Sequence, residues 1–148
     1  MKEFKGVEHR LEYVRTINEV EFINDSKATN IDSVIVAINT YKQPIVLILG
    51  GFNKGANFRL LLPHIKSSHV RDIVSYGDAG GQINTALGDA VRSVQVTDLS
   101  SAVKKAQLMA APGDIVLLSP GCASYDEFSN FEERGNHFKS IIKSIAIS

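Results

Sequence analysis

The chain has 148 residues, enough for one domain that buries about 68–70% of the surface its extended form would expose. Its 16 basic and 16 acidic residues cancel, which argues against a protein that binds nucleic acid or a membrane surface through excess positive charge. No apolar run approaches the roughly 20 residues that cross a bilayer, and we expect no signal peptide. The single cysteine, Cys122, cannot form a disulfide within the chain, which suits a reducing cytoplasm.

Strand and helix patterns alternate along the chain. Strands are predicted over residues 11–17, 20–24, 45–49, 70–76, 91–96 and 115–118. Helices are predicted over residues 30–40, 58–65, 82–87, 99–111 and 128–147. The first two strands meet at Asn18-Glu19, which favours a tight turn, and Asp98 is placed to cap the helix that follows it. The runs at 45–49 and 115–118 are continuously apolar, which is typical of strands buried on both faces of a parallel sheet.

This alternation predicts an α/β fold, namely a Rossmann-like, three-layer domain with a mostly parallel sheet of about six strands. Helices are expected on both faces of the sheet, with a β-hairpin at its N-terminal end. No repeat, low-complexity stretch or linker interrupts the pattern. We therefore expect residues 1–148 to form a single domain.

Three loops that follow predicted strands are unusually polar or rich in glycine. Every side chain of residues 24–30 except Ala28 carries a polar group, residues 50–57 combine glycines with Lys54, and residues 119–127 are largely polar. Ligands of open α/β sheets bind beyond the carboxyl ends of the strands, so these loops are predicted to surround one site. The glycine-rich turn at 77–81 is a fourth candidate for that edge. So many polar side chains indicate a ligand with several charged or polar groups.

Some of these residues also have a purely structural interpretation. Thr29 precedes Asp32 at the spacing of a helix start, and Ser124 with Glu127 forms a complete capping box. Both hydroxyls are therefore candidate helix caps as well as candidate ligands. Lys54 considered alone would be a solvated surface residue.

Several familiar chemistries are not indicated. Residues 50–54 lack the Gly-x-x-x-x-Gly-Lys-Ser/Thr pattern of a P-loop, and the turn at 77–81 lacks the dinucleotide-binding fingerprint. The 4 histidines show no metal-ligand spacing, so we predict structural or surface roles for them. No histidine pairs obviously with Cys122, which favours a buried, inert thiol over a nucleophile.

Five motifs taken together resemble the C-terminal domain of the Mur ligases. They are His9-Arg10, Asn24-Asp-Ser-Lys-Ala-Thr-Asn30, Gly50-Gly-x-x-Lys-Gly55, Ser119-Pro-x-Cys-Ala-Ser124 and Phe131-Glu-x-Arg-Gly135. Their order and spacing are similar along essentially the whole chain, and the block at 24–30 is distinctive for the members that add D-glutamate. The chain departs from the common pattern at Gly121, Tyr125 and Phe52-Asn53, which affects the shape of a pocket more than its chemistry.

The resemblance implies part of an ATP-dependent amide ligase of peptidoglycan precursor synthesis in the bacterial cytoplasm. In that family ATP phosphorylates the carboxylate of UDP-N-acetylmuramoyl-L-alanine, and the amino group of D-glutamate attacks the acyl phosphate. Members consist of a UDP-sugar domain, a central ATPase domain and the domain that this chain resembles, so Mg²⁺ ligands are expected outside the chain. The resemblance further implies a monomer in which this domain packs against the ATPase domain, and no turnover by the domain alone.

The resemblance carries binding roles to this chain but no catalytic residue and no metal ligand. Arg10 and Asp25 are implied to contact the ribose and phosphates of ATP. The implied substrate-binding set is Thr29 and Lys54 on one carboxylate of D-glutamate, Ser124 and the backbone N–H of Phe131 on the other, and Lys27 beside phosphate or substrate.

Two alternatives remain open at the level of the sequence. The chain could belong to a sister amide ligase, such as another Mur ligase or a folylpolyglutamate synthetase, although the block at 24–30 argues for the D-glutamate-adding members. It could also be a free-standing, non-catalytic binding domain of the same fold. The amino acid that the full-length protein adds decides the first alternative, and the gene sequence upstream of Met1 decides the second.

Overall fold

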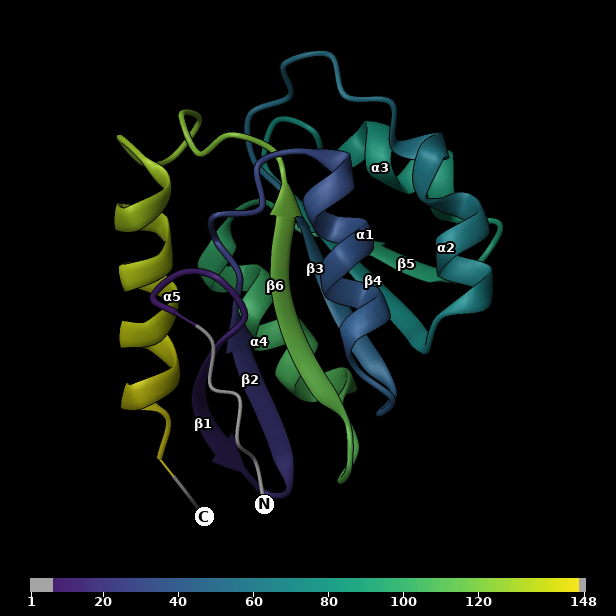
Figure 1. Cartoon of the computed structure of the whole chain (residues 1–148). Coiled ribbons are helices and arrows are strands. Elements are labelled where there is room, and N and C mark those ends of the chain that lie inside the picture. Colours follow the sequence, from purple (N-terminus) through teal and green to yellow (C-terminus); the bar gives the residue numbers. More distant parts are fainter. Residues whose placement is uncertain (1–6, 147–148) are drawn as a thin grey trace.

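The computed structural model describes residues 7–146 as a six-stranded sheet with helices on both faces (Figure 1). The strands are β1 (Glu12–Ile17), β2 (Val20–Asn24), β3 (Ile45–Gly50), β4 (Val70–Tyr76), β5 (Arg92–Gln95) and β6 (Ile115–Gly121). The helices are α1 (Ile31–Thr40), α2 (Leu62–Ser67), α3 (Gly80–Leu87), α4 (Leu99–Met109) and α5 (Phe131–Ser144), with a 3-10 helix η1 (Phe58–Leu61). The strand order is β1-β2-β6-β3-β4-β5, and only the β1–β2 hairpin is antiparallel. The predicted α/β, Rossmann-like sheet with an N-terminal hairpin is therefore confirmed.

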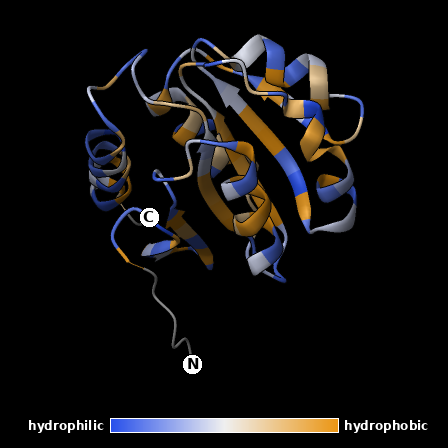
Figure 2. Cartoon of the chain, turned by 45° about the horizontal axis from the view of Figure 1, so that its top comes forward, coloured by the Kyte–Doolittle hydropathy of each residue, from blue (hydrophilic) through white to orange (hydrophobic). Residues whose placement is uncertain are grey.

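Hydrophobic cores lie on both faces of the sheet, because alternate residues of its central strands point in opposite directions. Ile45, Leu47 and Leu49 of β3 pack with α1, α2 and α3, whereas Val46 and Ile48 pack with α4 and α5. All five side chains are fully buried, as the continuous apolar run predicts for a strand covered on both sides. The hydrophobic segments gather accordingly in the middle of the sheet (Figure 2).

Several element boundaries differ from the prediction. The predicted helix over 58–65 is divided into η1 and α2, and Pro63 stands in the first turn of α2, where its missing N–H is tolerated. α5 begins at Phe131 rather than at residue 128, because the side chain of Asn130 caps it by accepting the N–H of Glu133 at 2.8 Å. The predicted last residue of this helix, 147, lies outside the described residues. The predicted cap of α4 is confirmed, since Asp98 accepts a first-turn N–H at 2.8 Å.

β6 continues through Ser119 and Pro120 to Gly121, residues that the sequence pattern assigns to a loop. Pairing across the sheet explains the extension, because Gly121 lies opposite Gly50 of β3. The edge strand β5 is shorter than predicted at both ends. These differences leave the order of elements unchanged, and the end of β6 pairs with the end of β3.

Both expected hydroxyl caps are wrong. Asn30, not Thr29, caps α1, and its side-chain oxygen accepts a first-turn N–H at 2.9 Å. Ser124 and Glu127 form no capping box, because no helix starts there and Glu127 instead accepts the N–H of Leu99 at 3.1 Å. The hydroxyls of Thr29 and Ser124 are consequently not used to begin a helix.

None of the helices between residues 7 and 146 combines the length and the apolarity that crossing a membrane requires.

Candidate functional site

The three polar loops meet at the carboxyl edge of the sheet, as their positions after β2, β3 and β6 predict. We call them the β2 loop (24–30), the β3 loop (50–57) and the β6 loop (119–127, which includes the end of β6). Backbone hydrogen bonds join these loops and the turn at 77–81. They run from Gly121 N–H to Ala28 O (2.8 Å), from Phe52 N–H to Ala123 O (2.8 Å) and from Ala79 N–H to Gly51 O (2.9 Å).

A cavity of about 360 Å³ lies where the loops meet, and we call it the Lys54 pocket. Four of the predicted substrate-binding residues line it, namely Thr29, Lys54, Ser124 and Phe131. A second cavity of about 310 Å³ shares Thr29 and Lys54 with the first. Residues from three loops and α5 thus bring an ammonium group, two hydroxyls and a helix N-terminus to one place. These are the groups with which proteins bind carboxylates.

Lys54 stands at the wall of its pocket on an aromatic support. Its Nζ lies 5.4 Å from the centroid of the Tyr125 ring, and the ring of Phe52 packs against Tyr125 at 6.3 Å between centroids. Among the ion pairs within residues 7–146, none involves Lys54. The side-chain oxygen of Asn53 accepts the N–H of Gly55 at 2.9 Å and so shapes the loop around the lysine. The ammonium group therefore remains available to an anionic ligand.

Phe131 contributes its backbone to the same pocket. As the first residue of α5 it has no partner for its N–H within the helix. The side chain of Asn130 caps a later N–H of the first turn, at Glu133, rather than that of Phe131. The positive end of the helix dipole adds to the attraction for a negative charge at this point.

The other three predicted residues line a smaller cavity of about 120 Å³, which we call the Asp25 pocket. They are Arg10, Asp25 and Lys27. The Asp25 carboxylate is buried there, and it accepts the N–H of Leu11 at 3.1 Å and the hydroxyl of Ser119 at 2.8 Å. Two hydrogen bonds thus hold one carboxylate at the junction of the segment before β1, the β2 loop and the end of β6.

Burial raises the pKa of Asp25 to about 6. The hydrogen bonds from Ser119 and Leu11 and the positive charge of Arg10 act in the opposite direction but do not cancel the effect. Within the described residues no cation lies close enough to Asp25 to form an ion pair. Among residues 7–146, Asp25 is therefore a buried acceptor whose nearest positive charge, that of Arg10, is too far away to form an ion pair with it.

Lys27 connects the two pockets. It lines the Asp25 pocket, while its Nζ lies 5.1 Å from the centroid of the Phe131 ring, which lines the Lys54 pocket. The predicted site residues thus fall into two adjoining groups, with Lys27 between them. The Asp25 pocket thus holds the residues that the resemblance assigns to ATP, and the Lys54 pocket holds those that it assigns to D-glutamate.

Residues 9–122 match the family model described as Mur ligase, glutamate ligase domain. The chain belongs to this family. It is 42% identical over 142 residues to UDP-N-acetylmuramoylalanine--D-glutamate ligase of Desulfatibacillum aliphaticivorans, covering 96% of this chain and 31% of that protein. It is 45% identical over 144 residues to the ligase of the same name of Clostridioides difficile (strain 630), covering 96% and 32%. The Mur ligase domain described here thus spans about a third of the length of these relatives.

Solved structures with low sequence identity share the fold of this Mur ligase domain. UDP-N-acetylmuramate-alanine ligase of Thermotoga maritima superimposes with a TM-score of 0.65 at 16% identity, covering 95% of this chain and 31% of that one. The bifunctional folylpolyglutamate synthase/dihydrofolate synthase of Yersinia pestis CO92 superimposes with a TM-score of 0.66 at 16% identity, covering 93% and 32%. At this identity the likeness concerns the fold alone.

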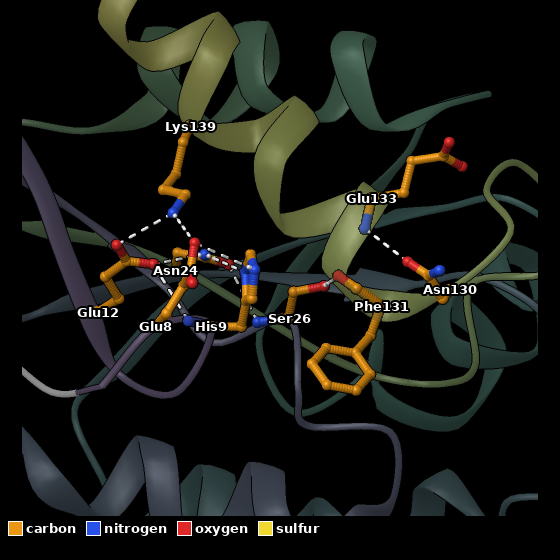
Figure 3. A network of polar contacts seen from close by, with 9 residues as sticks. All are labelled: Glu8, His9, Glu12, Asn24, Ser26, Asn130, Phe131, Glu133 and Lys139. Carbon is orange, nitrogen blue, oxygen red and sulfur yellow. Dashed lines mark hydrogen bonds and ion pairs between the residues drawn. The ribbon is translucent and has the colours of Figure 1, made fainter.

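A network of polar contacts holds the segment before β1 against α5 (Figure 3). Lys139 of α5 donates to Glu8 and to Glu12, each at 3.1 Å. His9 is buried, and its Nδ1 lies 3.0 Å from the side-chain nitrogen of Asn24. This histidine is structural, as predicted, and the network positions its neighbour Arg10 at the Asp25 pocket. Among residues 7–146, no group of three His, Cys, Asp or Glu side chains is placed to hold a metal ion.

Arg134 lies in this region, and the sequence analysis predicts no role for it. It is fully buried in α5, where it contacts both the β2 loop and the β6 loop. A signal for it exists in the sequence, because Arg134 stands four positions before the core residue Phe138 and thus on the apolar stripe of the helix. An arginine on such a stripe is buried, so its guanidinium needs hydrogen-bond acceptors within the folded chain.

Cys122 conforms to the prediction of a buried, inert thiol. Burial raises its pKa to about 12, although the nearby charge of Arg134 acts to lower it. A further cavity, of about 790 Å³, lies between the β3 loop, η1 and α3. It carries none of the predicted site residues, and sequence patterns did not indicate it.

Proposed function

We propose that the chain is the C-terminal domain of an ATP-dependent ligase that adds D-glutamate to UDP-N-acetylmuramoyl-L-alanine in peptidoglycan precursor synthesis. The observation that carries this proposal is the gathering of Thr29, Lys54, Ser124 and Phe131 around one cavity. The names of the relatives support it, and the D-glutamate-specific block at 24–30 supplies residues to both pockets.

D-glutamate carries two carboxylates, and the Lys54 pocket offers two pairs of groups for them. Lys54 and the hydroxyl of Thr29 hold one carboxylate, while the hydroxyl of Ser124 and the N–H of Phe131 hold the other. A hydrogen bond between such a charged pair contributes about 1.5–3 kcal/mol. Binding at both ends leaves the amino nitrogen between them as the free nucleophile.

The Asp25 pocket completes an ATP site in this proposal. Arg10 faces the phosphates, Asp25 accepts hydrogen bonds from the ribose hydroxyls, and Lys27 lies beside the phosphate that is transferred. In this proposal the Mg²⁺ that accompanies ATP takes its ligands from outside this domain. Asp25 suits the ribose because a buried carboxylate with no ion-pair partner is a strong acceptor.

The chemical step needs parts that residues 1–148 do not supply. The carboxylate of UDP-N-acetylmuramoyl-L-alanine attacks the γ-phosphorus of ATP, and ADP leaves. The uncharged amino group of D-glutamate then attacks the acyl carbon, and the tetrahedral intermediate expels phosphate to form the amide. The residues of this domain bind and orient D-glutamate, and none of them forms a covalent intermediate.

We propose further that residues 1–148 form one domain of a longer monomer located in the bacterial cytoplasm. This domain packs against a central ATPase domain, while a third domain binds the UDP-sugar. The relatives support this arrangement, because the chain covers about a third of their length. No nucleic acid or membrane takes part.

The test of the proposal is the amino acid that the full-length protein adds. Purified protein is supplied with UDP-N-acetylmuramoyl-L-alanine, ATP, Mg²⁺ and one amino acid at a time, and the products are identified by mass spectrometry. Amide formation with D-glutamate and not with L-alanine or L-glutamate is expected. Addition of another amino acid, or of glutamate to a folate, would identify a sister ligase instead.

The isolated 148-residue chain provides a second test. We expect neither ATP hydrolysis nor amide formation from it, because half of the nucleotide site and the whole UDP-sugar site are absent. D-glutamate is expected to bind with a dissociation constant of about 1 mM or weaker, since association costs entropy and part of the pocket wall is missing. Turnover by this chain alone would contradict the proposed division of labour.

A further inference from the structure

Arg134 is a buried charge that has no ion-pair partner within the described part of the chain. Its side chain is fully buried in α5, and among the ion pairs of residues 7–146 none involves it. Burying an unpaired guanidinium is unfavourable compared with burying an apolar side chain of similar size. An arginine in such a place therefore points to contacts that an apolar residue could not make.

The side-chain hydrogen bonds of Arg134 go to the β2 loop and the β6 loop. Its Nε donates to the hydroxyl of Ser26 at 2.9 Å, and its Nη2 donates to the backbone oxygen of Ser26 at 2.7 Å. Its Nη1 donates to the backbone oxygen of Cys122 at 2.9 Å. The Ser26 hydroxyl in turn donates to the backbone oxygen of Phe131 at 2.7 Å. One guanidinium therefore joins the β2 loop, the β6 loop and the first turn of α5.

These three segments carry substrate-binding groups close to the points of contact. Ser26 precedes Thr29 by three residues, Cys122 precedes Ser124 by two, and Phe131 lines the Lys54 pocket itself. The guanidinium is a planar, rigid fork, so its bonds set the directions as well as the distances between the segments. A lysine could keep the charge but could not reproduce three donors in one plane.

We infer that Arg134 is a positioning residue, which sets the spacing between Thr29, Ser124 and the Phe131 N–H to match the two carboxylates of D-glutamate. This inference rests on the proposed function. Arg134 touches no substrate in this scheme and acts through Ser26 and Cys122.

The chain contains a matched control at the other end of the same helix. The Nη1 atom of Arg15 donates to the backbone oxygens of Ile142, Lys143 and Ile145 at 3.0, 3.1 and 2.9 Å. Arg15 thus also uses its guanidinium to hold several backbone oxygens of α5, but it lines neither pocket. Arg15→Lys and Arg134→Lys therefore make the same chemical change at two places that differ in their relation to the pocket.

The experiment compares these variants in the full-length ligase. For Arg134→Lys, kcat/KM for D-glutamate is expected to fall about ten- to a hundred-fold, the size of effect that a small misplacement of binding groups produces. The KM for UDP-N-acetylmuramoyl-L-alanine is expected to stay unchanged, whereas a general loss of folded enzyme would lower kcat for every substrate alike. For Arg15→Lys, D-glutamate kinetics are expected to remain within about two-fold. Equal effects of the two variants on D-glutamate would overturn the inference.

Two further measurements cover the case in which Arg134→Lys does not fold. Ser26→Ala keeps the guanidinium but removes the hydroxyl that links it to Phe131, and a rise of about three-fold or more in the KM for D-glutamate is expected. An unchanged KM in this variant would also overturn the inference. In NMR spectra of the 148-residue chain, Ser26→Ala should shift the amide signals of Thr29, Ser124 and Phe131, and Arg15→Lys should not. A wild-type enzyme that does not use D-glutamate would instead refute the proposed function.

Discussion

Buried charged side chains at the two ends of the strands differ in whether they form ion pairs. At the amino ends of β4, β5 and β6, Asp72 accepts hydrogen bonds from Arg71 at 3.1 Å and from Arg92 at 2.8 and 3.1 Å, and Asp114 pairs with Arg71 at 2.8 Å. At the carboxyl ends, Asp25 and Arg134 are buried without an ion-pair partner among the described residues.

For Asp25 and the cations around it, we interpret this difference as one between charges that are satisfied within the fold and charges that are still available to a ligand. A buried ion pair is satisfied within the folded chain and gains nothing from a ligand. An unpaired buried carboxylate, or an ammonium group resting on an aromatic ring, keeps its bonding capacity for a molecule that arrives later. The predicted binding residues that carry a charge lie at the carboxyl edge, and none of them forms an ion pair with another residue of 7–146. They are Arg10, Asp25, Lys27 and Lys54.

The strongest test of this comparison removes the ammonium group of Lys54. In the full-length ligase, Lys54→Ala should weaken the use of D-glutamate about ten- to a hundred-fold, because a charged hydrogen bond is lost. Steady-state kinetics with D-glutamate as the varied substrate measure the effect. The matched control is Lys66→Ala in α2, whose side chain is exposed and lines neither pocket. An unchanged KM for D-glutamate in Lys54→Ala would remove this lysine from the site.

Breaking a paired charge at the opposite edge should affect stability instead of binding. Burial alone would raise the pKa of Asp72, but the hydrogen bonds and charges of Arg92 and Arg71 outweigh it and hold the pKa below its ordinary value. The stability that Asp72 contributes is therefore present above the ordinary aspartate pKa and is lost as the pH falls through the lowered value. Asp72→Asn should reduce the free energy of unfolding at neutral pH by about 1–3 kcal/mol.

Urea unfolding of the 148-residue chain measures this effect, and the D-glutamate kinetics of the full-length variant serve as the control. We expect those kinetics to match the wild type. A large rise in the KM for D-glutamate at unchanged stability would show that the amino edge is not purely structural.

The unpaired carboxylate of Asp25 should have the reverse effect on stability. Its pKa in the folded chain, about 6, lies above the ordinary value of 3.8, so the folded state holds the proton more tightly. The resulting stabilisation is complete below the ordinary value and is lost as the pH rises through about 6. Asp25→Asn should therefore raise the free energy of unfolding at neutral pH by up to about 3 kcal/mol while weakening the use of ATP.

The pH dependence distinguishes this explanation from a simple packing change. The stability gain of Asp25→Asn should shrink towards acidic pH and disappear where wild-type Asp25 is protonated in both states. A gain of equal size at all pH values would indicate that the carboxylate charge is not its origin.

The smallest expected effect concerns the aromatic support of Lys54. Tyr125→Leu removes the ring over which the ammonium group lies, an interaction of about 0.5–1 kcal/mol at an exposed position. The KM for D-glutamate should rise about two- to five-fold, because the free lysine side chain is less well ordered. Tyr125→Phe keeps the ring and should behave like the wild type. A similar change in both variants would assign the effect to the phenol hydroxyl.

Local sequence patterns predicted most of the fold correctly. The apolar run of β3 and the cap at Asp98 depend only on neighbouring residues, and both are found where expected. The polar loops were also located correctly at the carboxyl edge, because that edge follows from the alternation of strands and helices. The helix starts were less accurate, since Asn30 and Asn130 compete as caps with Thr29 and with Ser124.

The sequence by itself thus determined the order of elements, the family and the loops that meet at the carboxyl edge, because short motifs and periodic patterns encode each of these. Only the tertiary structure placed Lys27, whose role the sequence left open between phosphate and substrate, in the Asp25 pocket and beside the Phe131 ring. The tertiary structure alone also revealed the contacts of Arg134, which join this residue to Ser26, 108 positions earlier in the chain. Contacts across such a separation arise when the sheet brings the ends of its strands together, and no local pattern encodes them.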